Sequence, residues 1–140
     1  MGLTIYAKGM KETYNAGYGG YFYFRIEVAK AFDIEYGNII EEWMKSMKPL
    51  TQEMCDKLEE IITKKGLVEQ EEGIWCFISH SDCDGKFSPK ECRKIYYAIK
   101  DLKCDVTSTN YEREKEYNVL ERFKSMFYHC YKRRVNMYYR

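Results

Sequence analysis

Residues 80–92 form the one stretch of this sequence whose residue types and spacing could bind a cation: His-Ser-Asp-Cys-Asp-Gly-Lys-Phe-Ser-Pro-Lys-Glu-Cys. Aligned with a twelve-residue calcium-binding loop, it places candidate ligands at positions 1, 3, 5, 7 and 12, which are His80, Asp82, Asp84, Lys86 and Glu91. Lys86 would offer its main-chain carbonyl and Glu91 both carboxylate oxygens, while Gly85 allows the sharp turn. A neutral imidazole at position 1 is a poor calcium ligand, so the affinity of such a site would be weak.

Two further chemistries are open to the same stretch. Zinc could be bound by Cys76, His80, Cys83 and Cys92, although their spacing fits none of the usual paired ligand motifs. Cys83 could instead be a nucleophile, because His80 lies three residues away and could lower the pKa of its thiol. The sequence does not identify a third group that would orient this pair.

A structural interpretation assigns the stretch to a turn followed by a helix start. Asp82 and Asp84 would then accept hydrogen bonds from the main-chain amides of a tight turn. Ser88, Pro89 and Glu91 have the types and spacing of a capping box, with Ser88 as the N-cap. We favour this interpretation because the calcium pattern lacks its first ligand, and we keep the calcium and zinc sites as alternatives.

A second candidate site lies near the end of the chain, where aromatic and basic side chains occur together. Its members are Tyr128, Tyr131, Lys132, Arg133 and Arg134. Such side chains can stack on bases and pair with phosphates, which is how nucleotides and single strands are bound. The alternative is a helix end whose cations complement the helix dipole.

The formal net charge of +1 hides an uneven distribution. Residues 121–140 carry six basic and one acidic side chains, whereas residues 41–72 carry nine acidic and five basic ones. This two-sided pattern favours self-association or a charged partner. The low total charge argues against a protein that wraps duplex nucleic acid.

The spacing of apolar residues predicts a mainly α fold: a compact bundle of four to five helices with a short strand at residues 3–7. An α+β fold with a small sheet is the alternative. The helices are expected at residues 21–32, 39–47, 51–66, 88–102 and 111–134. Turns or loops are expected at residues 17–20, 33–37, 69–73 and 105–110. The apolar run at residues 74–78 is too short to assign to a strand or a helix.

The length of 140 residues, of which 45% are hydrophobic and 32% charged, predicts one globular domain spanning residues 1–140. This composition excludes a disordered chain, and no apolar run is long enough to cross a bilayer. The first residues lack the pattern of a secretory signal. We therefore expect a cytoplasmic protein whose six cysteines are reduced thiols packed as small hydrophobic groups.

Two blocks resemble known sequences. Met-Gly-Leu-x-Ile-Tyr at residues 1–6 and the block at residues 80–92 are similar to a group of small uncharacterised proteins found in phages, prophages and bacterial genomes. Over twelve residues, 80–91, the second block also resembles an EF-hand loop, with His80 in place of the first aspartate. The first resemblance implies a bacterial or phage source and a cytoplasmic setting, and it implies no reaction.

These observations favour a small non-enzymatic binding protein of phage or prophage type. We expect it to act on a host protein or to sequester a small anionic signal such as a nucleotide. The most specific form of this expectation is a protein that counteracts host defence. No cofactor is required and no membrane is expected as a partner, while a homo-oligomer is compatible with the charge pattern. The alternatives are a calcium- or zinc-binding structural module at residues 80–91 and a small enzyme using His80 and Cys83.

Overall fold

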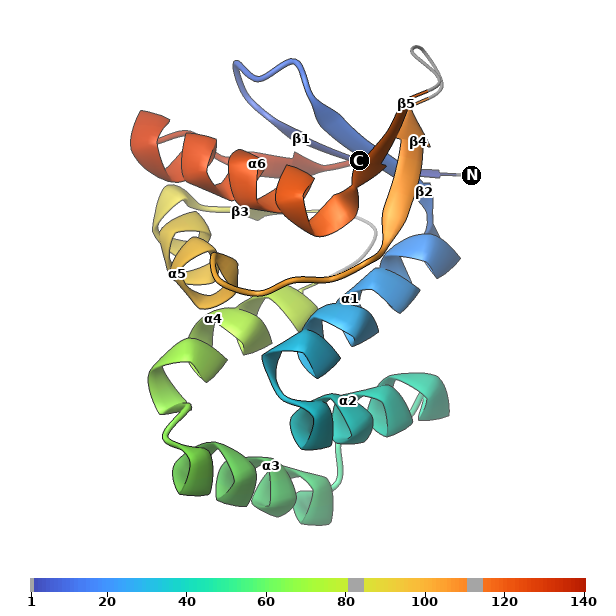
Figure 1. Cartoon of the computed structure of the whole chain (residues 1–140), viewed down its shortest axis with the longest axis vertical. Helices are drawn as coiled ribbons and strands as arrows, with labels where there is room; N and C mark the ends of the chain where they lie inside the picture. The colour runs from blue at the N-terminus through green and yellow to red at the C-terminus, as the bar shows by residue number, and fades with distance from the viewer. Residues whose placement is uncertain (1, 81–84, 111–114) are drawn as a thin grey trace.

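The computed structural model describes residues 2–80, 85–110 and 115–140, which form helices and short strands (Figure 1). The helices are α1 (Tyr18–Phe32), α2 (Ile34–Ser46), α3 (Gln52–Lys65), α4 (Val68–Ile78), α5 (Pro89–Ile99) and α6 (Val119–Arg133). The strands are β1 (Gly2–Ala7), β2 (Thr13–Gly17), β3 (Lys86–Phe87), β4 (Thr107–Asn110), β5 (Lys115–Asn118) and β6 (Met137–Tyr139). The expectation of a mainly α chain with a small sheet is confirmed, whereas the described residues hold six helices instead of four to five.

Four strands form an antiparallel sheet in the order β2-β1-β6-β3. Strand β1 pairs Leu3 with Ala16 of β2, and Ile5 with Tyr139 of β6. The strand expected at residues 3–7 is therefore confirmed, and the other three strands of its sheet are ones that we did not predict. Strands β3 and β6 have two and three residues, which is too short for alternation to be visible in the sequence.

One face of this sheet belongs to the hydrophobic core. Leu3, Ile5 and Ala7, which alternate along β1, are all buried. Helices α1 and α6 contact the sheet, and rings of five aromatic residues lie together in the core with centroids 5.1 to 6.4 Å apart: Tyr14, Tyr21, Phe24, Phe77 and Phe123. Such tilted and edge-on ring pairs add to the stabilisation that burial gives.

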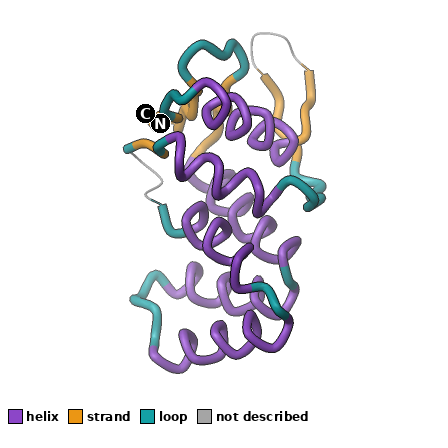
Figure 2. The backbone as a smooth tube through the Cα atoms, turned by 90° about the vertical axis from the view of Figure 1, so that its left-hand side faces the viewer, coloured by secondary structure: helices purple, strands orange, loops and turns teal. Residues whose placement is uncertain are grey.

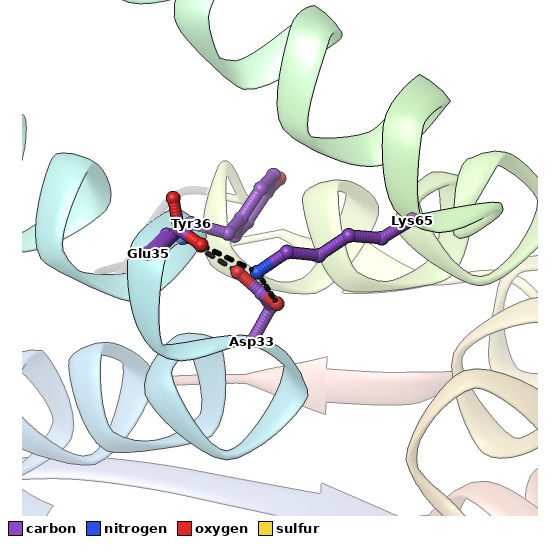
Figure 3. Close-up of polar contacts among 4 residues, drawn as sticks. All are labelled: Asp33, Glu35, Tyr36 and Lys65. Carbon is purple, nitrogen blue, oxygen red and sulfur yellow. Dashed lines mark hydrogen bonds and ion pairs between the residues drawn. The ribbon is translucent and has the colours of Figure 1, made fainter.

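Helices α1 and α2 are separated by the single residue Asp33, so the interruption expected at residues 33–37 was too long. The Asp33 side chain caps α2 by accepting a hydrogen bond from the Tyr36 amide at 3.0 Å. Lys65 at the end of α3 lies against this junction, with Nζ 2.7 Å from Asp33 Oδ2 and 2.8 Å from Glu35 Oε1 (Figure 3). The Tyr36 hydroxyl donates to Glu71 of α4 at 3.0 Å. These contacts tie α2 to α3 and α4.

Residues 69–73 were expected to form a solvated junction, but they lie inside α4 together with the unassigned run 74–78. Gly73 is buried at the crossing of α4 and α5. A β-carbon there would lie 2.5 Å from the Lys94 carbonyl oxygen and 2.6 Å from the Ala98 β-carbon. The prediction failed because this glycine allows two helices to approach closely, a role that its acidic neighbours in sequence conceal.

Local capping signals correctly placed helix α3. The Thr51 hydroxyl accepts a hydrogen bond from the Met54 amide at 3.1 Å, as an N-cap does. Gly66 ends the helix in the left-handed conformation, with a φ of 69°. Both residues act on main-chain groups within a few positions, so their effect can be read from the sequence.

The last helix was predicted over residues 111–134, but α6 begins at Val119. Residues 111–114 lie outside the described part of the chain, and Lys115–Asn118 form β5, which pairs with β4 where a loop was expected. The Asn118 side chain caps α6 by accepting from the Glu121 amide at 3.0 Å, which separates strand from helix. At the other end of the chain, α1 begins at Tyr18, so Gly19 and Gly20 are helical and do not form the expected turn.

Figure 2 shows the strands gathered at one end of the molecule, and Figure 1 places α2 and α3 at the opposite end. The two chain ends lie close together, because β1 and β6 are neighbours in the sheet. Among the residues that the structure describes, no helix has the length and apolar character needed to span a bilayer.

Candidate functional site

Helices α5 and α6 pack side by side and leave a shared outer surface. Their buried sides hold Cys92, Ile95 and Ile99 of α5 and Phe123 and Phe127 of α6. The helical period therefore turns a second set of side chains outward. We call this set the tyrosine–cation patch: Arg93, Tyr96, Tyr97, Lys100, Lys124, Tyr128, Tyr131 and Lys132.

Four tyrosines of the patch contact one another across the two helices. The Tyr96 ring lies 5.2 Å from that of Tyr128, and the Tyr97 ring 6.0 Å from that of Tyr131. Contacts within each helix complete the group, at 5.6 Å for Tyr96 with Tyr97 and 6.5 Å for Tyr128 with Tyr131. Tyr97 and Tyr128 are 47% and 45% exposed, so solvent reaches a large part of this aromatic group.

Cations lie beside three of the four rings, those of Tyr97, Tyr128 and Tyr131. The Arg93 guanidinium lies 5.5 Å from the Tyr97 centroid and 5.7 Å from that of Tyr131. Lys132 Nζ lies 5.0 Å from the Tyr131 centroid, and Lys100 Nζ lies 5.1 Å from that of Tyr97. These distances are within the range of cation–π attraction, which holds each cation near a ring without neutralising its charge.

A groove of about 360 Å³ runs between the two helices within the patch. Its lining residues are Tyr96, Lys100, Glu121, Lys124, Ser125 and Tyr128. Lys124 Nζ is held by the Leu102 carbonyl at 2.6 Å and by Glu121 Oε1 at 2.9 Å. The groove thus offers two aromatic walls and two ammonium groups against one carboxylate.

Two tyrosines of the patch, Tyr97 and Tyr131, also interact through their hydroxyl groups. Hydrogen bonding with Tyr97, and then with Arg93, lowers the pKa of Tyr131. The hydrogen bond to Tyr131 and its charge raise the pKa of Tyr97, which keeps its proton. An ordered aromatic surface loses little conformational entropy when a flat ligand stacks on it.

The patch contains three of the five residues predicted near the chain end: Tyr128, Tyr131 and Lys132. Arg133 is the last residue of α6 and Arg134 its left-handed C-cap, and both are exposed. The described cation–ring contacts of the patch involve Arg93, Lys100 and Lys132 instead of these two arginines.

The half of the patch that comes from α5 was not predicted. Arg93, Tyr97 and Lys100 are spaced four and three residues apart, so one face of a helix at residues 88–102 had to carry all three. That spacing could have indicated a surface with the same chemistry as the chain end. Only packing of α5 against α6 shows that the two surfaces are one.

Only some of the proposed metal ligands lie among the residues that the structure describes. Asp82, Cys83 and Asp84 lie outside the described residues. His80 Nε2 lies 3.0 Å from the Lys86 carbonyl oxygen, the atom expected at position 7 of a calcium loop. The His80 ring lies against Phe87 at 4.1 Å and Tyr139 at 4.6 Å. The structure therefore brings His80 and Lys86 together, through the contact between the His80 ring nitrogen and the Lys86 carbonyl oxygen.

Glu91 acts in the capping box that the sequence predicted. Its Oε1 accepts from the Ser88 amide at 2.9 Å, and the Ser88 hydroxyl accepts from the Glu91 amide at 3.2 Å. Its Oε2 accepts from the Cys76 thiol at 3.6 Å. Burial and the nearby Glu91 carboxylate raise the pKa of the Cys76 thiol to about 11, which favours the protonated thiol.

Within the described ranges 2–80, 85–110 and 115–140, no three side chains of His, Cys, Asp or Glu gather as a metal site would require. Because Asp82, Cys83 and Asp84 are not among these residues, the calcium, zinc and Cys83 hypotheses stay predictions. Next to this stretch, buried Arg25 donates from one Nη1 atom to the carbonyls of Ile78 and His80, each at 3.2 Å. This guanidinium satisfies carbonyls at the end of α4 that the helix itself leaves unbonded.

Comparison with known proteins gives no relative for this chain. No family model, no curated protein and no solved structure matches it. The resemblance of residues 1–6 and 80–92 to phage and bacterial proteins therefore stays an expectation from those residues. The tyrosine–cation patch brings aromatic rings and cations together on one described surface, and we take it as the candidate binding site.

Proposed function

We propose that this chain is a non-enzymatic binding protein that holds a small anionic ligand bearing an aromatic base on the tyrosine–cation patch. The observation that supports this most strongly is the connected group of four tyrosines, in which cations lie 5.0 to 5.7 Å from the centroids of Tyr97, Tyr128 and Tyr131. A base can stack on the exposed rings of Tyr97 or Tyr128. The cations beside these rings can then pair with phosphate oxygens.

The expected affinity follows from the number of such contacts. Stacking contributes about 1–3 kcal/mol per base, and charge-assisted hydrogen bonds about 1.5–3 kcal/mol each. One or two stacked bases with two phosphate contacts sum to about 4–12 kcal/mol, and association costs at least about 4 kcal/mol, so the expected Kd is micromolar at the tightest. A cyclic dinucleotide has two bases and two phosphates, so it matches the patch better than a mononucleotide does.

The biological role we propose is sequestration of such a nucleotide signal inside a bacterial cell by a phage- or prophage-type protein. Its support is the resemblance of the two short blocks and the described binding chemistry of the patch. An action on a host protein instead would use the same exposed aromatic and cationic side chains, since interfaces are enriched in Tyr and Arg.

The proposal is tested by calorimetric titration of the full chain with ATP, cyclic di-AMP and cyclic di-GMP. We expect at least one of them to bind, with a heat that disappears in the double variant Tyr97→Leu, Lys100→Gln. Tyr23→Leu is the matched control, because Tyr23 is 55% exposed on α1, outside the patch. Absence of binding to all three nucleotides, or binding that the patch variant retains, would refute the proposal.

A further inference from the structure

The four-stranded sheet has a second face, opposite the core, with its own chemistry. Because side chains alternate along each strand, the residues between the buried positions point away from the core. Tyr6 stands opposite Thr13 on one side and Tyr138 on the other, and Tyr138 stands opposite Lys86. We call the resulting set the outer sheet face: Thr4, Tyr6, Thr13, Asn15, Lys86, Tyr138 and Arg140.

The backbone register extends this face to the end of the chain. Thr4 and Arg140 exchange two main-chain hydrogen bonds, of 2.7 and 2.8 Å, so their side chains lie in one row with Asn15. Neighbouring positions Leu3, Ile5 and Tyr139 are buried, whereas the members of the outer sheet face are half-buried or exposed. Figure 2 shows the strands at one end of the molecule.

Aromatic rings lie at the centre of the outer sheet face. The rings of Tyr6 and Tyr138 are stacked, with centroids 5.5 Å apart and planes inclined by 25°. The Arg140 guanidinium lies 4.7 Å from the Tyr6 centroid. A stacked pair flanked by a guanidinium is the arrangement on which further flat groups can stack.

Hydrogen-bonding side chains border these rings. The Thr4 hydroxyl donates to Asn15 Oδ1 at 2.8 Å, and the Asn15 amide donates to Thr13 at 2.9 Å. Asn136 donates to the Tyr138 hydroxyl at 3.2 Å. The network fixes the orientation of amide and hydroxyl groups whose donors and acceptors can recognise base edges.

The charged side chains of the outer sheet face are cations. The seven side chains of the outer sheet face include two cations, Lys86 and Arg140, and no carboxylate. Lys8 and Lys11 are exposed in the connection between β1 and β2, where Glu12 is the acidic residue. Phosphate groups are therefore the charged partners that this part of the described surface complements.

From this geometry we infer that the outer sheet face binds single-stranded nucleic acid. Aromatic side chains on the open face of a four-stranded antiparallel sheet stack unpaired bases in RNA-recognition motifs. Here Tyr6 and Tyr138 would stack bases, while Arg140 and Lys86 would contact phosphates. The inference is independent of the proposed function, because it uses other elements, a polymeric ligand and a different face of the fold.

The test is fluorescence anisotropy of the full chain with labelled oligo-U RNA and oligo-dT DNA of about twelve nucleotides. Binding of either strand should weaken about tenfold in Tyr6→Leu and in Tyr138→Leu, while Tyr6→Phe, which keeps the ring, retains affinity. Arg140→Gln should make the slope of log K against log salt shallower by about 0.7. An unlabelled duplex should compete poorly, because its bases are already stacked.

Matched variants separate the two proposals. Tyr97→Leu with Lys100→Gln should leave oligonucleotide binding unchanged, and Tyr6→Leu should leave nucleotide binding to the patch unchanged. Arg140→Gln and Tyr6→Phe keep the inference testable if a leucine variant fails to fold. Absence of binding to both strands at low salt, equal competition by duplex, or loss of binding in the patch variant alone would overturn the inference.

Discussion

Replacing Gly73 by alanine tests the account of how α4 and α5 pack. An added β-carbon would lie 2.5 Å from the Lys94 carbonyl oxygen and 2.6 Å from the Ala98 β-carbon. Ordinary contacts begin near 3.4 Å, so the two helices must separate by about 0.9 Å at this point. Neither neighbour can rotate away, because one is a main-chain atom and the other is a β-carbon.

Two opposing effects set the magnitude. Alanine is better than glycine inside a helix by about 1 kcal/mol. Overpacking in a buried site costs about 1–3 kcal/mol, and rigid neighbours place this site at the upper end of that range. We therefore expect Gly73→Ala to lower the free energy of unfolding by about 1–2 kcal/mol. That loss corresponds to a decrease in Tm of about 3–8 °C.

The assay is urea denaturation followed by circular dichroism, with Gly19→Ala as the matched control. Gly19 is exposed in α1, and a β-carbon there would meet no atom within 4 Å. The same substitution should therefore stabilise the chain by about 0.5–1 kcal/mol. A Gly73→Ala variant as stable as the unmodified protein, or more stable, would refute the close approach of α4 and α5.

Three further outcomes are expected. Ser88→Ala should lower the free energy of unfolding by about 1 kcal/mol through loss of the capping box, measured by urea denaturation, whereas Ser125→Ala on the exposed side of α6 should change it little. Burial raises the pKa of Asp33, but hydrogen bonds from Lys65 and the Tyr36 amide outweigh it and lower the pKa overall. The stability that ionised Asp33 contributes is therefore present above its unfolded pKa of about 4 and lost as pH falls through the lower folded value. Urea titrations across this range should show a smaller acid-induced loss in Asp33→Asn, and an equal loss would contradict the assignment. Calcium, zinc and chelator should each leave the Tm unchanged if residues 80–91 are a structural turn, whereas a rise with either ion would support the metal-site hypothesis.

Much of the helical structure could be read from local signals. Thr51, Gly66 and Ser88 act on main-chain groups three to five residues away, and each caps the helix end where the sequence placed it. The pairing of β4 with β5 was hidden because Lys115–Asn118 carry charged and polar residues typical of a helix start. There the strand pairing and the Asn118 cap decided the structure against local preference.

The sequence could likewise predict one group of candidate-site residues but not the other. Tyr128, Tyr131 and Lys132 are spaced as neighbours on one helix face, so the sequence indicated their shared surface. Their partners Arg93, Tyr97 and Lys100 lie about thirty residues earlier, and no local pattern relates the two groups. The contact exists because the apolar sides of α5 and α6 are buried against each other, which turns the remaining sides outward together.

By itself, the sequence determined the mainly helical character, the caps of α3 and α5, the strand at the start of the chain and three members of the tyrosine–cation patch. These features depend on residues within one or two helical turns or on simple alternation. Only the tertiary structure decided the sheet order, the helical state of residues 74–78 and the joining of both halves of the patch. Each of these requires pairing or packing between distant segments, such as β1 with β6, whose free energy depends on the whole fold and leaves no local pattern.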